Sequence, residues 1–545
     1  MNFTPNLSLY RAFREVAKTY PNNVAIYFYN NKISFSKLDK EIDKWASILQ
    51  NDFDIQKGDS VLISLPNIPQ VIVLFYAVNK IGAVANMVHP HTPMEQMQKF
   101  YDESNCKLAF LFSQKVYKAL NEYKKFAGNI ILCDIETYFN GKIIKHLVDI
   151  YFSSSRKALE RNTKFMFYRK FKDNKMEVKE IPLSDKDTSV LLHSASTTGK
   201  AKTIMLSGRS FNFTASRVPE IMCMSETDLV NKTMVSLLPS FHGFGLCMTM
   251  HAPLVNGFSI ALLPKFSSSN VVKVMNKTKN VISICGVPVV FKALANDPSF
   301  RNNRYLKVLQ SCFSGGDSLP LIVKEVFDSA MIRAKSRCRL FEGYGLTEAL
   351  SVSCVNTHYH HKSGSVGYPM AGVNFAILDE NNNFLEPNEI GEIAIKSKNN
   401  MLGYYRDEGA TKATYAGDYL KTGDVGYIDE DGFVYFTSRK KRVIKVSGVA
   451  VFPSEIESII SHIPGVKGVC AIQIPDENLA HAVKVLVVSN NKDPEIIKAE
   501  VKKHLISWAI PKEVEFVSSL PYTKYRKVDY RKLQKEEDKK RGIID

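Results

Sequence analysis

The residues best suited to chemistry in this sequence stand in one loop that is rich in hydroxyl groups and closed by lysines. The stretch 193–203 follows the apolar run 189–192, which predicts a strand ending in a polar loop. Backbone N–H groups, hydroxyls and ammonium groups are donors that hold phosphate oxygens. We therefore expect this loop to bind a polyphosphate such as ATP, through these residues: Ser194, Ser196, Thr197, Thr198, Gly199, Lys200 and Lys202.

This loop is not a Walker loop, because that pattern requires a glycine where Ser194 stands. A solvated polar loop without a ligand has the same composition, and on this stretch alone the two interpretations are equally good. Motifs in other parts of the chain distinguish an ATP-binding loop from a solvated one.

Two glycine-rich loops offer a second set of candidates. The stretches 314–320 and 342–348 each follow an apolar run, as expected for loops at strand ends, where open α/β sheets bind ligands. Glycines flank Tyr344, so its ring can lie flat against a base. Thr347 supplies a hydroxyl for a phosphate, and Glu348 supplies a carboxylate for Mg²⁺. Either loop alone is equally well explained as a simple glycine-rich turn.

A weaker candidate is the turn that begins at His242 and continues as Gly243-Phe244-Gly245. It follows the apolar run 235–238 and Pro239, and its glycines would let the backbone approach a ligand closely. A lone histidine after a strand is more often structural than functional.

The elements that must position these loops alternate between strands and helices. Apolar strands separated by helical stretches such as 71–79 are the βαβ signature of a parallel sheet, which predicts an α/β fold. The predicted strands are 61–65, 83–88, 130–133, 234–238, 259–263 and 281–285. Upstream, 23–29 and 32–35 predict a hairpin, with Ser36 capping the helix that follows.

Composition limits the class of protein. With 545 residues, 45% apolar and 23% charged, the chain is long enough for more than one domain and a large core. Its net charge of +17 favours anionic ligands, acidic partner proteins or anionic lipid surfaces, and no nucleic-acid motif accompanies it.

The nine cysteines are scattered without CxxC pairs, which indicates reduced thiols in a cytoplasmic protein. The first residues lack the pattern of a signal peptide, and the longest apolar run, 71–78, is too short to span a bilayer.

A basic and aromatic segment at 156–180 carries five aromatic or apolar residues in the run 165–171 among nine lysines and arginines. Such a segment can dock on an acidic carrier protein or an anionic membrane surface. We favour the alternative, a basic surface insertion whose aromatic residues are buried.

These stretches, in this order, resemble the adenylate-forming superfamily, which includes acyl-CoA synthetases, firefly luciferase and the adenylation domains of peptide synthetases. The resemblance covers almost the whole chain. Further motifs that match in family order are 364–369, 391–394, 401–405, 419–424, 431–432, 439–441, 445–448, 453–457 and 520–527.

The resemblance implies a large N-terminal domain at 1–440, with two βαβ-rich sheets and a small β-barrel subdomain. It also implies a small mobile α+β domain at 441–545 that rotates about a hinge at Lys441. Within the small domain, Ser454 followed by Glu457 predicts a capping box at the start of a helix.

The implied activity is that of an ATP-dependent acid–thiol ligase, an acyl-CoA synthetase of the AMP-forming type. The acid becomes an acyl-AMP with loss of pyrophosphate, and a thiol then displaces AMP. ATP, Mg²⁺ and CoA are the implied small molecules, with an acyl carrier protein as the alternative acceptor of the acyl group. Peripheral membrane contact is compatible with this interpretation.

The resemblance also implies a role for each matching residue. Lys527 would bridge the carboxylate and the α-phosphate, His242 would lie at the junction of acyl group and pantetheine, and Glu348 would hold the metal. Thr347 would contact the α-phosphate. The remaining implied residues are Gly316, Asp317, Ser318, Tyr344 and Gly345 around adenine, Asp424 and Arg439 at the ribose, Lys441 in the hinge and Gly448 for the thiol step.

The chain departs from the family pattern in two motifs. Ser196, Ala201 and Thr203 stand where the family usually has glycine, proline and glycine. In the closing motif, residues 522 and 524–526 are Tyr, Lys, Tyr and Arg in place of Lys, Pro, Asn and Gly. Because the lysines themselves are present, we expect activity, with a non-catalytic nucleotide binder as the alternative.

The turn after Pro239 also bears on the class of substrate. The stretch 240–245 contains no acid to pair with an amino group, which favours an uncharged fatty or aryl acid. An apolar pocket is expected from Phe244, Gly245, Gly286, Val287, Phe291, Ser314 and Leu346.

The stretch 316–319 also matches the nucleophile motif of a group of lipases and esterases, with Ser318 as nucleophile. The Asp-x-x-His that such esterases need downstream is missing from this sequence.

Overall fold

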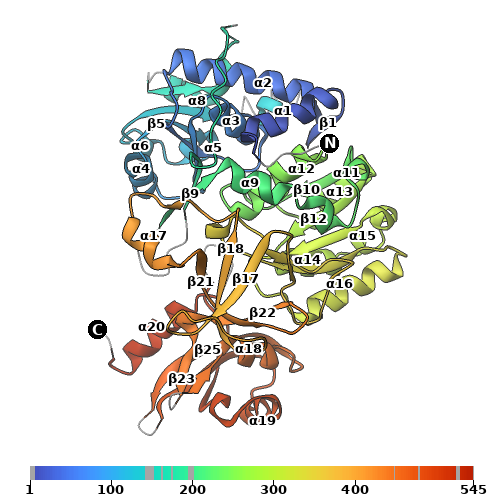
Figure 1. The fold of residues 1–545 in the computed structure, drawn as a ribbon, viewed down its shortest axis with the longest axis vertical. Coiled ribbons are helices and arrows are strands. Elements are labelled where there is room, and N and C mark those ends of the chain that lie inside the picture. Colours follow the sequence, from blue (N-terminus) through green and yellow to red (C-terminus); the bar gives the residue numbers. More distant parts are fainter. Residues whose placement is uncertain are drawn as a thin grey trace. The chain divides into compact units, whose positions relative to one another are not determined.

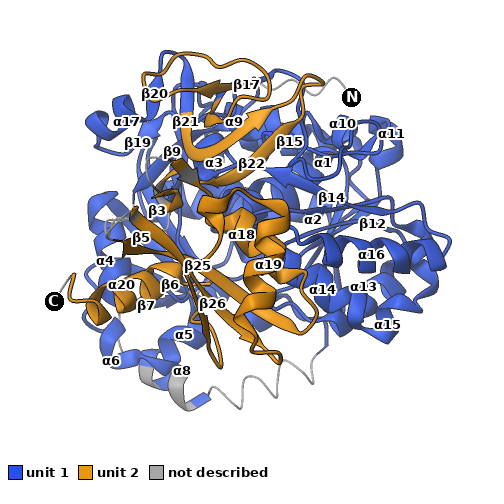
Figure 2. Ribbon diagram, turned by 90° about the horizontal axis from the view of Figure 1, so that it is seen from below, with its two compact units in different colours: residues 1–374, 395–420 blue, residues 375–394, 421–545 orange. Residues whose placement is uncertain are grey.

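The computed structural model describes residues 6–141, 153–160, 164–173, 176–193, 202–446, 449–476, 479–522 and 528–543. The chain divides into two compact units (Figure 2). The larger unit contains residues 1–374 and 395–420, and the smaller unit contains residues 375–394 and 421–545. The predicted α/β architecture, with a large N-terminal part and a smaller C-terminal part, is confirmed.

The first sheet of the larger unit has nine strands, and its centre is parallel (Figure 1). Parallel neighbours place their carboxyl ends at one edge, which is where the glycine-rich loops begin. In spatial order the strands are β16 (Tyr368–Pro369), β15 (Cys354–Val355), β14 (Arg339–Tyr344), β13 (Ser311–Ser314), β12 (Val281–Gly286), β10 (Thr233–Ser236), β11 (Ser259–Leu262), β1 (Val24–Phe28) and β2 (Asn31–Ser34).

The second sheet has eight strands and ends in two antiparallel additions, β9 on β8 and β19 on β9. Its order is β19 (Gly403–Tyr404), β9 (Thr203–Ser207), β8 (Thr188–His193), β4 (Val84–Met87), β3 (Ser60–Ser64), β5 (Cys106–Phe112), β6 (Asn129–Cys133) and β7 (Phe165–Phe167). The predicted strand at 189–192 is therefore β8, and the polar loop is its connection to β9.

The helices of this unit pack mainly through amphipathic faces, but α3 (Pro69–Lys80) is buried over its whole length. An apolar helix without a polar face belongs in the interior. The others are α1 (Leu9–Thr19), α2 (Phe35–Ser47), α4 (Met94–Glu103), α5 (Ser113–Lys118), α6 (Leu120–Tyr123), α8 (Ser153–Glu160), α9 (Gly208–Ala215), α10 (Val218–Met222), α11 (Glu226–Leu229), α12 (Ala252–Val255), α13 (Ser268–Thr278), α14 (Pro288–Asn296), α15 (Pro298–Arg301), α16 (Leu321–Arg333) and α17 (Glu408–Thr414).

The predicted hairpin is present as β1 and β2, but the predicted cap of α2 is wrong. Ser34, not Ser36, is the N-cap, and its hydroxyl accepts a hydrogen bond from Lys37 N at 3.2 Å. The helix begins one residue after β2 ends, so Ser36 already lies inside the first turn.

The basic and aromatic segment folds as the interpretation we favoured predicts. Phe165, Phe167 and Tyr168 are each at most 4% exposed, and Arg156 is buried in ion pairs with Asp134 and Glu136. Much of this segment's aromatic surface and part of its charge are therefore used inside the larger unit.

The smaller unit contains a three-stranded sheet, β25 (Val466–Asp476), β26 (Ala480–Ser489) and β27 (Glu513–Phe516), and a hairpin of β23 (Ile444–Val446) and β24 (Val449–Val451). Its helices are α18 (Pro453–Ser461), α19 (Pro494–His504) and α20 (Tyr530–Lys540). A five-stranded sheet, most of whose residues belong to this unit, is formed by β17 (Val373–Leu378), β18 (Gly391–Ser397), β20 (Tyr415–Ala416), β21 (Tyr419–Ile428) and β22 (Val434–Arg439).

The predicted capping box of α18 is wrong. Phe452 is the N-cap residue, and the Ser454 hydroxyl donates to the Thr437 carbonyl oxygen instead. The Glu457 carboxylate pairs with Arg442 at 2.5 Å and accepts from Ala471 N at 2.9 Å. Both side chains therefore make tertiary contacts rather than closing the first turn of their own helix.

No helix within the described ranges is long and apolar enough to cross a membrane.

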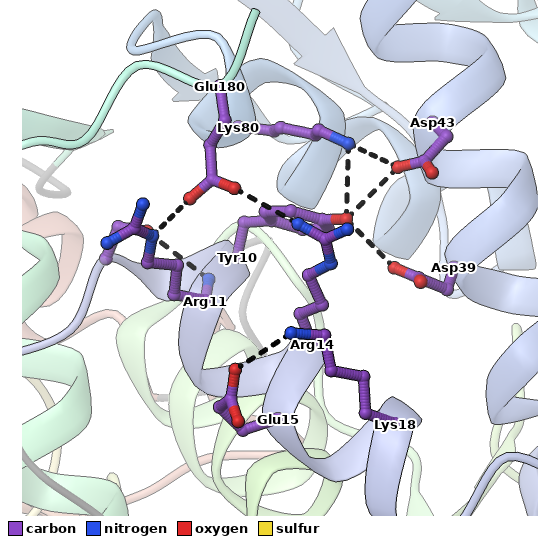
Figure 3. Close-up of polar contacts among 10 residues, drawn as sticks. Tyr10, Arg11, Arg14, Glu15, Lys18, Asp39, Asp43, Lys80 and Glu180 are labelled. Carbon is purple, nitrogen blue, oxygen red and sulfur yellow. Dashed lines mark hydrogen bonds and ion pairs between the residues drawn. The ribbon is translucent and has the colours of Figure 1, made fainter. Parts of the chain in front are cut away.

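A buried ammonium group ties the first three helices together. Figure 3 shows Lys80, the last residue of α3, pointing between Tyr10 of α1 and Asp43 of α2. Its Nζ lies 3.2 Å from the Tyr10 hydroxyl, which donates to Asp39 Oδ1 at 3.0 Å. The Lys80 side chain is 6% exposed and Asp43 is 45% exposed, so one partner is desolvated and the other is not. Burial raises the pKa of Asp39, with Asp43 as the next cause.

We expect Lys80→Met to lower the free energy of unfolding by about 2 kcal/mol, because it leaves two neighbouring carboxylates without their buried cation. The measurement is urea denaturation followed by Trp45 fluorescence in a Trp508→Phe background. Lys18→Met is the matched control, because the Lys18–Glu15 pair is exposed and its loss should change stability by no more than about 0.5 kcal/mol. Equal effects of the two substitutions would contradict this account.

Candidate active site

The polar loop is anchored at both of its ends. His193 and Thr203 face each other in the antiparallel pair of β8 and β9, and His193 Nδ1 lies 3.1 Å from Thr203 Oγ1. Its Nε2 lies 2.6 Å from Asn86 Oδ1, and its ring stacks on Phe100 at 3.8 Å. Burial lowers the pKa of His193 to about 3, so the imidazole is neutral at physiological pH.

Among the predicted residues of this loop, only Lys202 belongs to the described residues. The others, Ser194, Ser196, Thr197, Thr198, Gly199 and Lys200, lie outside the described ranges. No role was predicted for His193. A histidine at the end of a buried strand was the available signal, but its partner Asn86 is distant in sequence.

Lys202 and Glu348 meet on the same tyrosine. The Lys202 ammonium lies 4.1 Å from the centre of the Tyr404 ring, and the Tyr404 hydroxyl donates to Glu348 Oε1 at 3.1 Å. Glu348 O also accepts from Met401 N at 2.7 Å. Burial, reinforced by the Glu348 charge, raises the pKa of Tyr404, which keeps it a donor. A cation from one predicted motif and a carboxylate from another thus lie close together.

The turn that carries Thr347 and Glu348 is tightly constrained. It is a 3₁₀ turn, η6 (Thr347–Ala349), followed by two residues with positive φ, Leu350 at 37° and Ser351 at 78°. Residues other than glycine pay a cost in this region, and such strain is typical of functional loops held by their surroundings. A Cβ on Gly345 would lie 1.4 Å from Ser351 O, so glycine is required here by the chain's own backbone.

The two predicted adenine loops lie at neighbouring strand ends, because β13 and β14 are parallel partners. Tyr344 ends β14 and is partly buried, while Gly316 has a φ of 77°, a conformation that favours glycine. Ser318 N donates to Asp317 Oδ1 at 3.1 Å. These residues therefore share one edge of the first sheet.

Glu342 holds one of these loops, a role that the sequence analysis did not assign. Its Oε1 accepts from Leu319 N at 3.1 Å, directly after Ser318. Burial raises the pKa of Glu342 to about 7, and the bond from Leu319 and the charge of Lys324 oppose this shift. The Glu342 carboxyl group therefore holds the loop after β13 in place through Leu319 N, and it is not one of the predicted nucleotide contacts.

The His242 turn stands beside the same edge. His242 is partly buried, and the π-helical segment η4 (Phe244–His251) begins two residues later. A Cβ on Gly315 would lie 3.2 Å from the Phe244 ring, so this turn and the loop after β13 are in contact. A Cβ on Gly245 would lie 2.0 Å from Pro239 O, so this glycine too is needed for backbone packing.

In the smaller unit, Asp424 and Arg439 are cross-strand partners on β21 and β22. Arg439 NH1 lies 2.8 Å from Asp424 Oδ1, with side-chain exposures of 56% and 1%. Asp424 N is also bonded to Thr422 Oγ1 at 3.1 Å. Lys441 lies in the turn η7 (Lys440–Arg442), and its side chain is not described. Gly448 and Lys527 lie outside the described residues.

A magnesium site built from protein ligands alone is not found in the described part of the chain, where no three His, Cys, Asp or Glu residues gather. Mg²⁺ commonly uses one or two carboxylates together with substrate phosphates. The Glu348 carboxylate, whose Oε1 accepts a hydrogen bond from Tyr404, could serve as such a ligand together with the phosphates of ATP.

We expect the partly buried Glu342 to make stability depend on pH. Its folded-state pKa of about 7 lies above the ordinary value of 4.5, so it stabilises the fold fully below pH 4.5 and this contribution is lost as the pH rises through 7. Replacing it in Glu342→Gln should remove that part of the slope. The measurement is the free energy of unfolding across this range, with the exposed Glu325→Gln as control. An unchanged slope in Glu342→Gln would show that this carboxyl does not titrate as described.

Two family models match this chain, and full-length relatives align with nearly all of it. Residues 13–405 match the AMP-binding enzyme family, and residues 455–527 match the AMP-binding enzyme C-terminal domain. A long-chain-fatty-acid–CoA ligase of Bacillus subtilis (strain 168) is 29% identical, covering 99% of this chain and 96% of the relative. The ligase of the same name from Salmonella typhimurium is also 29% identical, covering 99% and 95%.

Solved structures share the fold. The ATP-bound MatB from Rhodopseudomonas palustris superposes with a TM-score of 0.81 at 22% identity, covering 97% of this chain and 98% of that one. The o-succinylbenzoate CoA synthetase MenE from Bacillus subtilis, in complex with its acyl-adenylate, gives 0.79 at 21% identity, covering 96% and 97%. With its loops gathered at the sheet edges and a family match over most of its length, this chain belongs to the AMP-binding enzyme family.

Proposed function

We propose that this protein is an AMP-forming acid–thiol ligase that activates a fatty or aryl carboxylic acid as acyl-AMP and transfers the acyl group to CoA. The observation that carries the proposal is the arrangement of Lys202 and Glu348 on Tyr404, at 4.1 Å and 3.1 Å. It brings together a cation for phosphate oxygens and a carboxylate for a metal, in a chain of the AMP-binding enzyme family.

The first step would make the acid reactive. A carboxylate oxygen attacks the α-phosphorus of ATP, and the bond to pyrophosphate breaks. Lys200 and Lys202 would offset charge on the leaving pyrophosphate, and Lys527 would bridge the carboxylate and the α-phosphate. Thr347, in the constrained turn, would donate its hydroxyl to the α-phosphate. Mg²⁺ held by Glu348 would supply further positive charge to the phosphates.

The second step would transfer the acyl group. The thiol sulfur attacks the carbonyl carbon, the bond between that carbon and the AMP oxygen breaks, and AMP leaves with its negative charge. His242 would lie at the junction of acyl group and thiol, and Gly448 would belong to the surface that admits the thiol. We propose the domain boundary and hinge at Lys441, so that the residues 441–545 present Lys527 in one step and Gly448 in the other.

The nucleotide would be recognised by side chains and by backbone groups of the predicted motifs. Tyr344 and Gly345 with the 316–318 backbone would hold adenine. Asp424 would accept from the ribose hydroxyls, because an ionised carboxylate is an acceptor with several lone pairs. Arg439, with a side chain 56% exposed, would reach the ribose or a phosphate.

Fatty acids are the favoured substrates within the class. The Bacillus and Salmonella relatives, aligned over nearly their whole length, are named for long-chain fatty acids. The turn at 240–245 offers no acid for an ammonium group, and its Phe244 presents an apolar ring beside Gly315. CoA is favoured over an acyl carrier protein, because the basic segment buries its aromatic residues and pairs Arg156 internally.

The test is the exchange of labelled pyrophosphate into ATP, measured with a panel of fatty, aryl and amino acids. We expect exchange with fatty or aryl acids and none with amino acids. Lys527→Ala should reduce exchange by about 10²- to 10³-fold, because it removes the cation that stabilises the transition state of adenylation. CoA should then release AMP from the wild-type complex.

Lys524→Ala is the matched control, because it removes a lysine from the same motif and should retain exchange. Exchange that survives Lys527→Ala would refute the proposed role of Lys527. No exchange with any acid would replace the proposal by the non-catalytic nucleotide binder, and cleavage of a simple ester without ATP would support the esterase alternative at Ser318.

A further inference from the structure

A cavity of about 500 Å³ opens in the larger unit, and none of the predicted nucleotide-binding residues lines it. Its walls come from α2 and from two short turns, η2 (Ile135–Tyr138) and η3 (Tyr168–Lys170). Its polar lining side chains include those of Lys37, Glu41, Lys44, Tyr138, Tyr168 and Arg169. Its volume lies in the range of sites that bind small molecules.

The walls are held in place before any ligand arrives. The Tyr168 ring stacks on the buried Trp45 ring at 4.2 Å, and its hydroxyl lies 3.2 Å from the Tyr138 hydroxyl. Asn31 Nδ2 donates to Tyr138 O at 2.9 Å, which fixes the turn η2 against β2. Binding of a ligand would therefore cost little conformational entropy in these side chains.

The acidic groups around the cavity already have protein partners. The Arg156 guanidinium holds Glu136, and Glu41 Oε2 accepts from the Tyr138 hydroxyl at 3.4 Å. Arg169 Nε lies 3.6 Å from Asp134 Oδ2, so these two charges balance.

Two lysines of α2 that line the cavity have no acidic partner of this kind. Lys37 and Lys44 make no ion pair with any of the residues that the structure describes. Together with Glu41 they recur at helical spacing on the face of α2 that lines the cavity. Two ammonium groups against one carboxylate leave an excess of positive charge at the opening.

We propose that this cavity binds a small phosphate-bearing molecule with hydroxyl groups, through Lys37 and Lys44. A lysine ammonium binds phosphate as a point charge. The amides of Asn31 and Asn140, which also line the cavity, match the hydroxyl groups of such a ligand. A soluble metabolite and a phospholipid headgroup share this chemistry. The proposal is independent of the ligase activity.

The buried Trp45 provides a local reporter, because it stacks on the Tyr168 wall and the chain has only two tryptophans. In a Trp508→Phe background, titration with glycerol 3-phosphate should change Trp45 fluorescence in a saturable way, while glycerol should not. Lys37→Gln and Lys44→Gln should each weaken binding about tenfold, since each removes a charged hydrogen bond to phosphate. Pyrophosphate exchange should be unchanged in both.

Lys40→Gln is the matched control, because Lys40 is an exposed lysine of α2 that does not line the cavity. Binding of glycerol 3-phosphate in solution would identify a soluble ligand. Sedimentation with phosphatidylglycerol vesicles but not phosphatidylcholine vesicles, lost in Lys37→Gln, would identify a lipid headgroup. No saturable change with either probe, or equal binding by Lys37→Gln, Lys44→Gln and Lys40→Gln, would overturn the proposal.

Discussion

The hydrogen bonds between the segment 401–404 and Glu348 are the constraint on which the candidate active site depends. Met401 N binds Glu348 O at 2.7 Å and the Tyr404 hydroxyl binds Glu348 Oε1 at 3.1 Å, while Gly403 and Tyr404 pair with β9 as strand β19. The loop after β14 in one sheet is thereby tied to the edge of the other sheet. As a consequence, the Lys202 ammonium and the Glu348 carboxylate contact the same tyrosine, Tyr404.

Close backbone packing gives these loops their shape. Gly345 and Gly245 leave no room for a Cβ against Ser351 O and Pro239 O, and the left-handed Leu350 and Ser351 donate backbone hydrogen bonds to Thr347 O and Leu346 O. Binding groups placed on a scaffold of this kind are positioned before the ligand arrives, which lowers the cost of ordering them. The glycines that the sequence analysis associated with ligand approach therefore serve the protein's own backbone at these two positions.

The sequence predicted the elements better than the contacts between them. Apolar runs and polar loops predicted β8, the parallel pairing of strands and the loops at strand ends, because these signals are local. Ser36 and Ser454 were wrongly predicted as caps, since the start of α2 is set by the end of β2 and Ser454 bonds to distant Thr437. The roles of Tyr404, His193 and Glu342 depend on partners far along the chain, which no local pattern reveals.

The central claim is that the carboxylate itself attacks the α-phosphorus of ATP and that AMP later leaves with one of its oxygens. The direct measurement uses a fatty acid with both carboxyl oxygens replaced by ¹⁸O, together with ATP, Mg²⁺ and CoA, and mass spectrometry of the products. The account predicts one ¹⁸O in AMP and none in pyrophosphate. Label in inorganic phosphate with formation of ADP, or AMP without label, would contradict it.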